Sequence, residues 1–182
     1  MPPLTALDAG RAAVLRSFSW RDGHADVWSV FADGPAFEAV VAALAAPWRE
    51  SGISHVLGIE SRGFLLGGAV AVRLGTGFVA IRKDGGLLPG PKLVADSRPD
   101  YRGLSHRLRM QCVLRAGHRV LLVDDWAERG SQASAVARLV EQAGAELAGL
   151  SLIVDQLDDD LRASLGRVTS LVRAGELGDP DG

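Results

Sequence analysis

The chain has 182 residues and is 47% hydrophobic, so it is long enough to bury a substantial core and short enough to form one domain. Its 22 acidic residues nearly balance its 20 Lys and Arg residues, and the formal net charge is -2. Without a strong overall field, we expect no general attraction to nucleic acid or to an anionic membrane. Any recognition of phosphate must then depend on a local arrangement of donors and cations.

The cysteine content and the hydropathy pattern predict a soluble protein of the cytoplasm. Cys112 is the only cysteine, so no internal disulfide can form. The sequence contains neither a signal peptide with a basic start nor an apolar run of 18 residues. We expect Cys112 to be a buried thiol in a strand rather than a nucleophile, because a reactive cysteine needs a positioned base.

The first half of the chain predicts a strand–helix–strand unit. Apolar residues between positions 37 and 48 recur at helical spacing, and Pro47 is expected to kink or end that helix. Residues 55–59 read as a short apolar strand, residues 63–74 as a helix rich in Ala, Leu and Val, and residues 77–81 as a second strand.

A stretch rich in Gly and Pro follows, from residue 84 to about residue 106. It has almost no periodicity and is too long for a simple connection within a compact domain. We interpret it as a functional loop.

The second half continues the alternation of strands and helices. The pattern predicts strands at 119–123, 147–154 and 167–172, a helix at 131–143, and a short acidic helix at 158–165, with a tail after about residue 177. This order is typical of an α/β fold with a mainly parallel sheet flanked by helices, here as a single domain over residues 1–182. Its ligand site should lie beyond the carboxyl ends of the strands.

One such strand end carries two acids. The run 119–123 leads directly into Asp124 and Asp125, and a helix begins a few residues later, near Ser131 and Gln132. Backbone N–H groups and the helix dipole at such a turn favour an anion such as phosphate. The carboxylates could accept hydrogen bonds from sugar hydroxyls or hold a hydrated Mg²⁺. The alternative is that they merely cap and solubilise the strand end.

Four ordered motifs resemble those of a known family. The segment 119–132 (RVLLVDDWAERGSQ) resembles the phosphoribosyl pyrophosphate (PRPP) signature of type I phosphoribosyltransferases. Residues 60–65 (ESRGFL), 81–83 (IRK) and 88–91 (LPGP) resemble the pyrophosphate-binding turn, the next strand and the start of the mobile loop of adenine phosphoribosyltransferases. Spacing agrees as well, and the resemblance extends over about residues 16 to 175.

The resemblance implies a type I phosphoribosyltransferase fold with a mobile active-site loop and a small hood. It implies an enzyme that transfers the 5-phosphoribosyl group of PRPP to a purine or purine-like base and releases pyrophosphate, as in purine salvage. Mg²⁺ would be bound mainly by PRPP and water, near Asp124 and Asp125. Relatives generally form homodimers, so we expect a dimer whose substrates are small molecules.

The resemblance also assigns site residues. Asp124 and Asp125 would be catalytic, and the 5-phosphate loop would comprise Trp126, Ala127, Glu128, Arg129, Gly130, Ser131 and Gln132. Pyrophosphate would be bound by Ser61, Arg62, Gly63, Arg82 and Lys83, in a turn that holds a cis peptide between Glu60 and Ser61. Two guanidinium groups and one ammonium group suit a departing pyrophosphate on physical grounds too.

The chain departs from the family pattern at three places. The loop usually reads Ala-Thr-Gly-Gly-Thr, and residues 128–132 keep only the central glycine of that motif. Arg129 could grip phosphate directly, whereas Glu128 would oppose it unless it pairs or points away. In the loop of about residues 93–109, His106 falls where relatives carry a catalytic glutamate, with Tyr101 and Gly103 as alignment markers.

The third departure concerns the base. The position at which relatives stack a phenylalanine on adenine falls at about His24, followed by Ala25, so the base could differ from adenine. Trp126 could belong to the core or line the ribose or base pocket. Two alternatives stay open: a non-catalytic PRPP- or nucleotide-binding or regulatory protein that kept the fold, and a hydrolytic relative. The retained Arg62 and acid pair favour the transferase.

Overall fold

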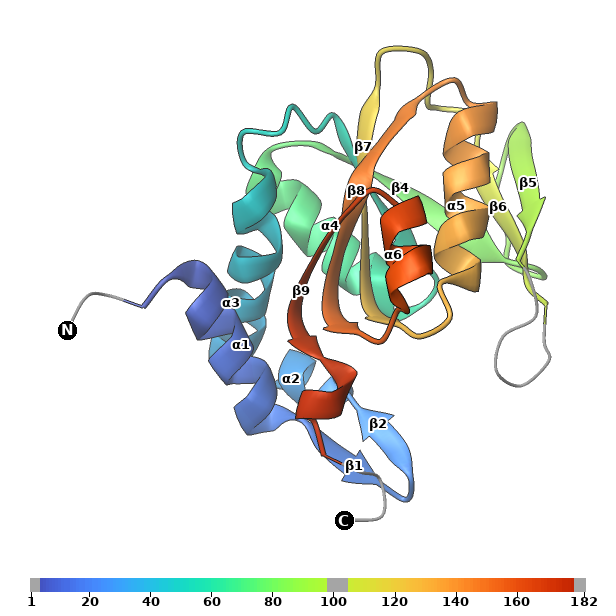
Figure 1. Cartoon of the computed structure of the whole chain (residues 1–182). Coiled ribbons are helices and arrows are strands. Elements are labelled where there is room, and N and C mark those ends of the chain that lie inside the picture. The colour runs from blue at the N-terminus through green and yellow to red at the C-terminus, as the bar shows by residue number, and fades with distance from the viewer. Residues whose placement is uncertain (1–3, 98–104, 179–182) are drawn as a thin grey trace.

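The computed structural model describes residues 4–97 and 105–178, which form a central sheet covered by helices on both faces and a small hairpin at one end (Figure 1). The sheet order is β5 (Lys92–Asp96), β6 (Arg107–Gln111), β4 (Gly77–Lys83), β3 (His55–Ile59), β7 (Arg119–Ala127), β8 (Glu146–Asp155) and β9 (Arg167–Arg173). Five strands, β4, β3, β7, β8 and β9, are mutually parallel. β6 runs antiparallel to both of its neighbours, β4 and β5. The predicted mainly parallel sheet is confirmed.

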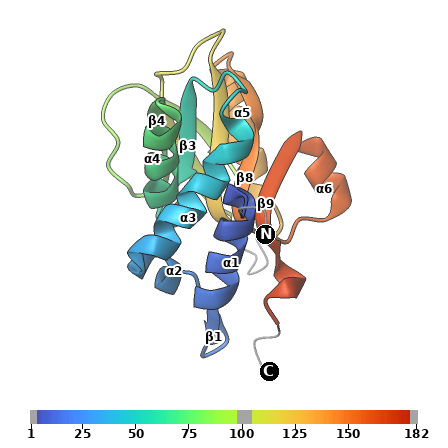
Figure 2. The same ribbon diagram turned by 90° about the vertical axis from the view of Figure 1, so that its left-hand side faces the viewer.

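Each face of the sheet buries its own apolar cluster. One face is covered by α1 (Ala6–Ser17), α3 (Gly34–Ala45) and α4 (Arg62–Leu74), which lie in front of the strands in Figure 2. The other face is covered by α5 (Ser131–Gln142) together with the short α6 (Asp159–Ser164). Because helices cover both faces of the sheet, its strands are apolar on both sides. This explains the continuous run of buried residues at 120–123 in β7.

The remaining elements are short. They are the hairpin of β1 (Ser19–Arg21) and β2 (His24–Asp26), α2 (Trp28–Ala32), and the 3-10 turns η1 (Ala46–Trp48) and η2 (Ala174–Glu176). Pro47 lies in η1, directly after α3, so the helix ends where the sequence predicts. In the described part of the chain, no helix is both long and apolar enough to cross a membrane.

The prediction of one long loop from residue 84 to about residue 106 is partly wrong. The middle of this stretch contains β5, which pairs with β6, and the two strands form an arm at the edge of the sheet. Ala95 of β5 packs with Leu108 and Met110 of β6, and this contact, distant in sequence, decides the structure of a segment with little periodicity of its own. Tyr101 and Gly103 lie outside the described residues.

The prediction that Cys112 is a buried strand residue is also wrong. It lies in the turn after β6 and is exposed, so it is not a buried strand thiol. Its backbone N–H donates to the carbonyl of Pro91, at the start of the arm.

Two glycines fix the start of α4 against the sheet. A Cβ on Gly58 in β3 would lie 2.0 Å from the carbonyl oxygen of Gly63, so only glycine permits this approach. The turn between strand and helix is thereby held close to the strand ends. It contains the expected cis peptide between Glu60 and Ser61.

Candidate active site

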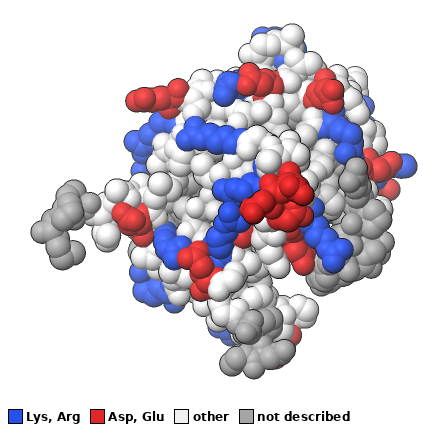
Figure 3. Space-filling model, in the orientation of Figure 1, with Lys and Arg blue, Asp and Glu red and all other residues white. Residues whose placement is uncertain are grey.

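Two adjoining hollows open at the carboxyl ends of β3 and β7. The larger, of about 640 Å³, lies between the β1–β2 hairpin and residues 126–133, and we call it the hairpin pocket. The smaller, of about 520 Å³, is lined by residues 60–62, 83–84 and 124–126, and we call it the acid pocket. Arg62, Asp124, Trp126 and Gln132 line both. Acidic and basic side chains are interspersed over the face of the molecule seen in Figure 3.

The acid pair belongs to a strand and not to the turn after it. β7 continues four residues beyond the predicted end, to Ala127, and Asp124 is still paired in register with Leu152 of β8. Alternation along the strand places Asp125 on a buried side, while Asp124 and Trp126 are only partly buried. Because a strand holds both carboxylates, their positions are more rigid than a turn would make them.

Arg62 is the counter-ion of the acid pair. It is the first residue of α4, and its Nε lies 2.9 Å from Oδ2 of Asp125. The Asp125 side chain is only 7% exposed, whereas that of Arg62 is 34% exposed. The guanidinium group therefore balances a buried charge and still faces both pockets.

The two carboxyl groups titrate abnormally. Burial raises the pKa of Asp124 well above its ordinary value, and the neighbouring negative charge of Asp125 raises it further. Burial also raises the pKa of Asp125, although the positive charge of Arg62 opposes that rise. The pair thus holds protons more tightly than two exposed aspartates would.

Replacing Asp124 by Asn is expected to stabilise the protein without ligand at pH 8. Because its pKa is raised, Asp124 in the folded protein retains a proton that it loses in the unfolded chain. Its favourable contribution to the free energy of unfolding is therefore complete at low pH and disappears as the pH rises through the raised pKa. An amide has no such penalty. We expect the melting temperature to rise by about 2–4 °C at pH 8 and by less at pH 5, measured by calorimetry.

Asp125→Asn is the matched control for this substitution. It removes a charge from the same strand but also breaks the ion pair with Arg62, so its melting temperature should not rise. Equal rises in the two variants, or no rise for Asp124→Asn, would contradict the assignment of the penalty to Asp124.

The loop after β7 presents the start of α5 to the hairpin pocket. Gly130 precedes the helix with φ of 55°, and no side chain caps the first turn. The positive φ favours glycine here, and a Cβ on Gly130, 2.6 Å from a methyl carbon of Leu161, would also force that side chain to shift. The first N–H groups of a helix have no partner within the helix, and at Ser131 to Ala133 the residues that carry them line the pocket, an arrangement suited to an anion.

The hairpin closes the other side of this pocket. Trp20, Gly23, His24 and Ala25 line it. The Trp20 ring packs 5.4 Å from Phe18 and 6.1 Å from Trp126, measured between centroids, and its Nε1 donates to the carbonyl of Leu177.

Trp126 belongs partly to the core and partly to the pockets. Its ring packs against the edge of the core, and it lines both pockets. Its Nε1 donates to Oε1 of Gln156, 2.8 Å away, at the carboxyl end of β8. Sequence reasoning missed Gln156 and the pocket role of Trp20. The rule that ligands meet the carboxyl ends of parallel strands could have identified Gln156.

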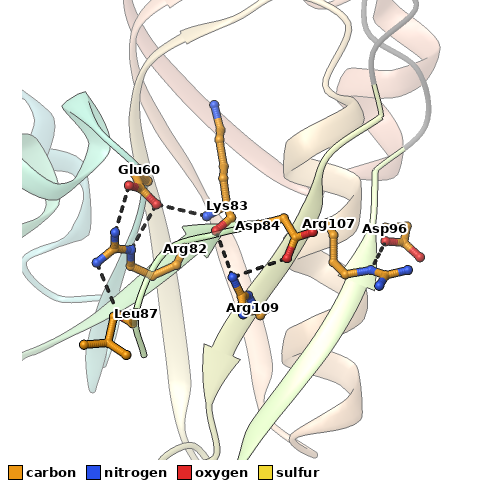
Figure 4. A network of polar contacts seen from close by, with 8 residues as sticks. All are labelled: Glu60, Arg82, Lys83, Asp84, Leu87, Asp96, Arg107 and Arg109. Atoms are coloured by element: carbon orange, nitrogen blue, oxygen red, sulfur yellow. Dashed lines mark hydrogen bonds and ion pairs between the residues drawn. The ribbon is translucent and has the colours of Figure 1, made fainter. Parts of the chain in front are cut away.

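The structure gathers most of the sequence-predicted residues, but not all. Residues 126–132, Arg62, Asp124, His24 and Ala25 line the hairpin pocket, and Ser61, Lys83 and Asp125 line the acid pocket. Gly63 lies close to Asp124, since a Cβ added to it would be 3.1 Å from Oδ1 of that residue. Arg82 lines neither pocket, because its side chain is paired with Glu60 (Figure 4).

His106 also lies outside the lining of both pockets. It immediately precedes β6 in the arm, where its backbone N–H donates to Oγ of Ser97 and its carbonyl accepts from the Ser97 N–H. Within the described residues, no group of three or more His, Cys, Asp and Glu side chains gathers to hold a metal ion. Asp124 and Asp125 nevertheless offer the carboxylate oxygens that Mg²⁺ prefers.

A parallel sheet with an acid pair, a cation and an uncapped helix start at its strand ends defines an α/β protein that binds a phosphorylated small molecule. Residues 27–164 match the family described as phosphoribosyl transferase domain. The chain belongs to the phosphoribosyltransferase family, as its motifs indicate.

Within the family, the similar proteins are adenine phosphoribosyltransferases. One from Cereibacter sphaeroides is 41% identical over 133 residues, covering 73% of this chain and 74% of that protein. One from Rhodococcus jostii is 38% identical over 173 residues, covering 90% and 96%. A crystal structure of the Rhodothermus marinus enzyme has a TM-score of 0.80 at 29% identity, covering 90% of this chain and 98% of that one.

The Saccharomyces cerevisiae enzyme, complexed with an imino-altritol bisphosphate and adenine, has a TM-score of 0.77 at 30% identity, covering 89% of this chain and 98% of that one. The predicted type I phosphoribosyltransferase fold is therefore confirmed.

Proposed function

We propose that this phosphoribosyltransferase transfers the 5-phosphoribosyl group of PRPP to a purine base and releases pyrophosphate. The observation that carries the proposal is that Arg62, the acid pair and the uncapped start of α5 all face two adjoining pockets. Adenine is the first candidate base, because the similar relatives bear that substrate in their names. Because His24 and Ala25 stand where relatives stack a phenylalanine on adenine, another purine-like base is the second candidate.

The 5-phosphate would bind at the start of α5. The backbone N–H groups of the first turn of α5 can donate to phosphate whatever the side chains are. This suits a loop that lacks the threonines usual in the family. Arg129 adds a guanidinium group at the rim, and Ser131 adds a hydroxyl. Glu128 also lines the pocket, so binding requires it to turn away or to pair with Arg129.

Pyrophosphate would occupy the acid pocket. Arg62 and Lys83 supply the positive charge there, and Ser61 supplies a hydroxyl and a backbone N–H. Asp124 and Asp125 would accept hydrogen bonds from the ribose diol once the sugar spans the two pockets. Bound Mg²⁺, held through PRPP and water beside these carboxylates, would neutralise charge on pyrophosphate.

The reaction then needs little covalent chemistry from the protein. The bond from C1 of the ribose to pyrophosphate breaks as a base nitrogen forms its bond to C1, and positive charge develops on the sugar. Arg62 and Lys83 stabilise the negative charge on the leaving group, while the acid pair stands beside the sugar. Positioning of both substrates supplies the remaining rate enhancement.

The base would lie under the hairpin. Trp20 and Trp126 offer flat apolar rings at this end of the hairpin pocket, which suit a planar heterocycle. We assign His106 the handling of the base proton once substrates bind, as the family alignment suggests. A cytoplasmic homodimer is part of the same proposal.

Binding of PRPP tests this function directly. We expect the wild-type protein to bind PRPP with Mg²⁺ in titration calorimetry and Asp125→Asn to bind it about 10-fold or more weakly, since the variant loses a ribose acceptor and the partner of Arg62. Asp96→Asn, which changes an exposed carboxylate on the arm, is the control and should bind normally. Unchanged affinity in Asp125→Asn would remove that residue from the site, and no binding by the wild type would overturn the proposal.

A further inference from the structure

We infer that Gln156, which directly follows β8, is a specificity residue for the base. Its carbonyl oxygen fixes the indole ring of Trp126, and its amide N–H groups donate to a ring nitrogen or an oxo oxygen of the base. This inference rests on the proposed function and adds to it a side chain that contacts the edge of the base.

The hydrogen bond to Trp126 decides which way the Gln156 amide faces. The indole Nε1 can only donate, and it lies 2.8 Å from Oε1 of Gln156, so the carbonyl oxygen must be the atom on that side. The NH2 group then faces away from the indole nitrogen. Within residues 4–97 and 105–178, it donates to no protein group. Its two N–H donors are therefore available to a ligand in the pocket that Gln156 lines.

The backbone around Gln156 is firmly held. Its N–H donates to the carbonyl of Ala127, the last residue of β7, at 2.9 Å. On either side of it, the Leu157 N–H donates to Oδ1 of Asp155, also at 2.9 Å, and the Asp155 side chain is fully buried. Because the backbone is fixed before and after Gln156, little conformational freedom is lost when its side chain binds a ligand.

Gln156 lies on the aromatic side of the hairpin pocket. It lines that pocket and not the acid pocket. Its partner Trp126 packs edge-on against Trp20 of the hairpin, with 6.1 Å between the ring centroids. The next residue, Leu157, lies toward the turn before α5 instead, since its methyl carbon is 3.0 Å from a Cβ placed on Gly130. Gln156 is thus directed to the place proposed for the base rather than to the place proposed for the 5-phosphate.

The two indole rings cannot supply hydrogen bonds to a base. Nε1 of Trp20 already donates to the carbonyl of Leu177, and Nε1 of Trp126 donates to Gln156. The rings therefore offer apolar surface only. Gln156 adds the donors that they lack, and purines carry ring nitrogens with free lone pairs besides the nitrogen that bonds to ribose. We expect the site to favour a planar heterocycle with such an acceptor at its edge.

The test compares AMP with ribose 5-phosphate, which lacks the base, in titration calorimetry. The ratio of the two affinities measures the contribution of the base, because a change at the phosphate weakens both ligands alike. We expect this ratio to fall about 10-fold in Gln156→Leu, which loses the donors. It should fall about 30-fold in Gln156→Glu, whose carboxylate still accepts from Trp126 but sets lone pairs against the acceptor of the base.

A wild-type ratio in Gln156→Glu would show that Gln156 only holds the indole ring, and it would overturn the donor role. Equal losses for both ligands would place Gln156 at the phosphate and would overturn the inference as well. Gln142→Leu is the matched control, because Gln142 lies on α5 outside both pockets and makes only a long contact of 3.5 Å with the carbonyl of Val94. Its ratio should equal that of the wild type.

Nuclear magnetic resonance of the Trp126 indole N–H tests the fixing of the ring without any ligand. Its exchange with solvent should be several-fold faster in Gln156→Leu and should stay slow in Gln156→Glu. Unchanged exchange in Gln156→Leu would refute this part of the inference. A wild type that binds AMP more tightly than ribose 5-phosphate, yet forms no nucleotide from PRPP and any base, would refute the proposed function and leave the role of Gln156 standing.

Discussion

Replacing Arg62 by Met is expected to lower kcat/KM for phosphoribosyl transfer by about 100- to 1,000-fold, the largest effect of any single cation. Arg62 is the only cation common to both pockets among the described residues, and it contacts Asp125. In the proposed function, its guanidinium group stabilises the departing pyrophosphate. Met retains the volume of the side chain and removes only the charge and the donors. Steady-state kinetics with PRPP and adenine measure the loss.

Arg73→Met is the matched control, because Arg73 lies on the same helix and makes an exposed contact of 3.9 Å with Glu38. Its kcat/KM should stay within about 2-fold of wild type. Arg62→Met also leaves Asp125 buried without its partner, so a drop in stability is expected as well. Adding Asp125→Asn should recover stability but not activity, and recovery of activity would contradict a direct role for Arg62.

Replacing Asp155 by Asn is expected to lower the free energy of unfolding by about 3–5 kcal/mol. Asp155 ends β8 with no exposed side-chain surface and pairs with both Arg162 of α6 and Arg173 of β9. Its Oδ1 accepts the N–H of Leu157 at 2.9 Å. Asn can retain that hydrogen bond but leaves two guanidinium groups without their counter-ion, so α6 loses one of its contacts with the sheet.

Denaturant unfolding followed by circular dichroism measures this change. Asp96→Asn breaks an ion pair in which both side chains are more than half exposed, and it should change stability by less than about 0.5 kcal/mol. A loss below about 1 kcal/mol for Asp155→Asn would show that the buried pair contributes no more than a surface pair does.

Elements with a local signal were predictable from the sequence. Residues 55–59 were predicted as a strand with the bounds that β3 has, because a short apolar run between turn residues has few alternatives. The helix α1 was missed, although Thr5 and Asp8 form a capping box at its start. Its apolar face is narrow and it packs mainly on α3, so composition alone gave no clear period.

The sequence predicted which residues gather at the candidate site better than it predicted where their side chains lie. Motifs identified the acid pair and Arg62, because their residue types and order survive even where the fold around them is unknown. They could not tell which of Arg82 and Lys83 lines the acid pocket. Val79 and Ile81 are buried on the α5 side of β4, so alternation places Lys83 with them and Arg82 on the other face.

The exact extent of β7 depended on a partner strand. Asp124 and Trp126 are paired with β8, and nothing in the local sequence distinguishes two acids inside a strand from two acids just beyond it. The same applies to the arm, where β5 exists only because β6 pairs with it.

Turnover is the most direct test of the account. Purified protein is incubated with PRPP, Mg²⁺ and, one at a time, adenine, hypoxanthine, guanine, xanthine and simpler heterocycles, while pyrophosphate release and product mass are followed. We expect release of pyrophosphate and formation of a new nucleoside monophosphate with a purine, with adenine as the first candidate. PRPP that raises the melting temperature without yielding a nucleotide from any base would contradict it and would favour a non-catalytic binding protein.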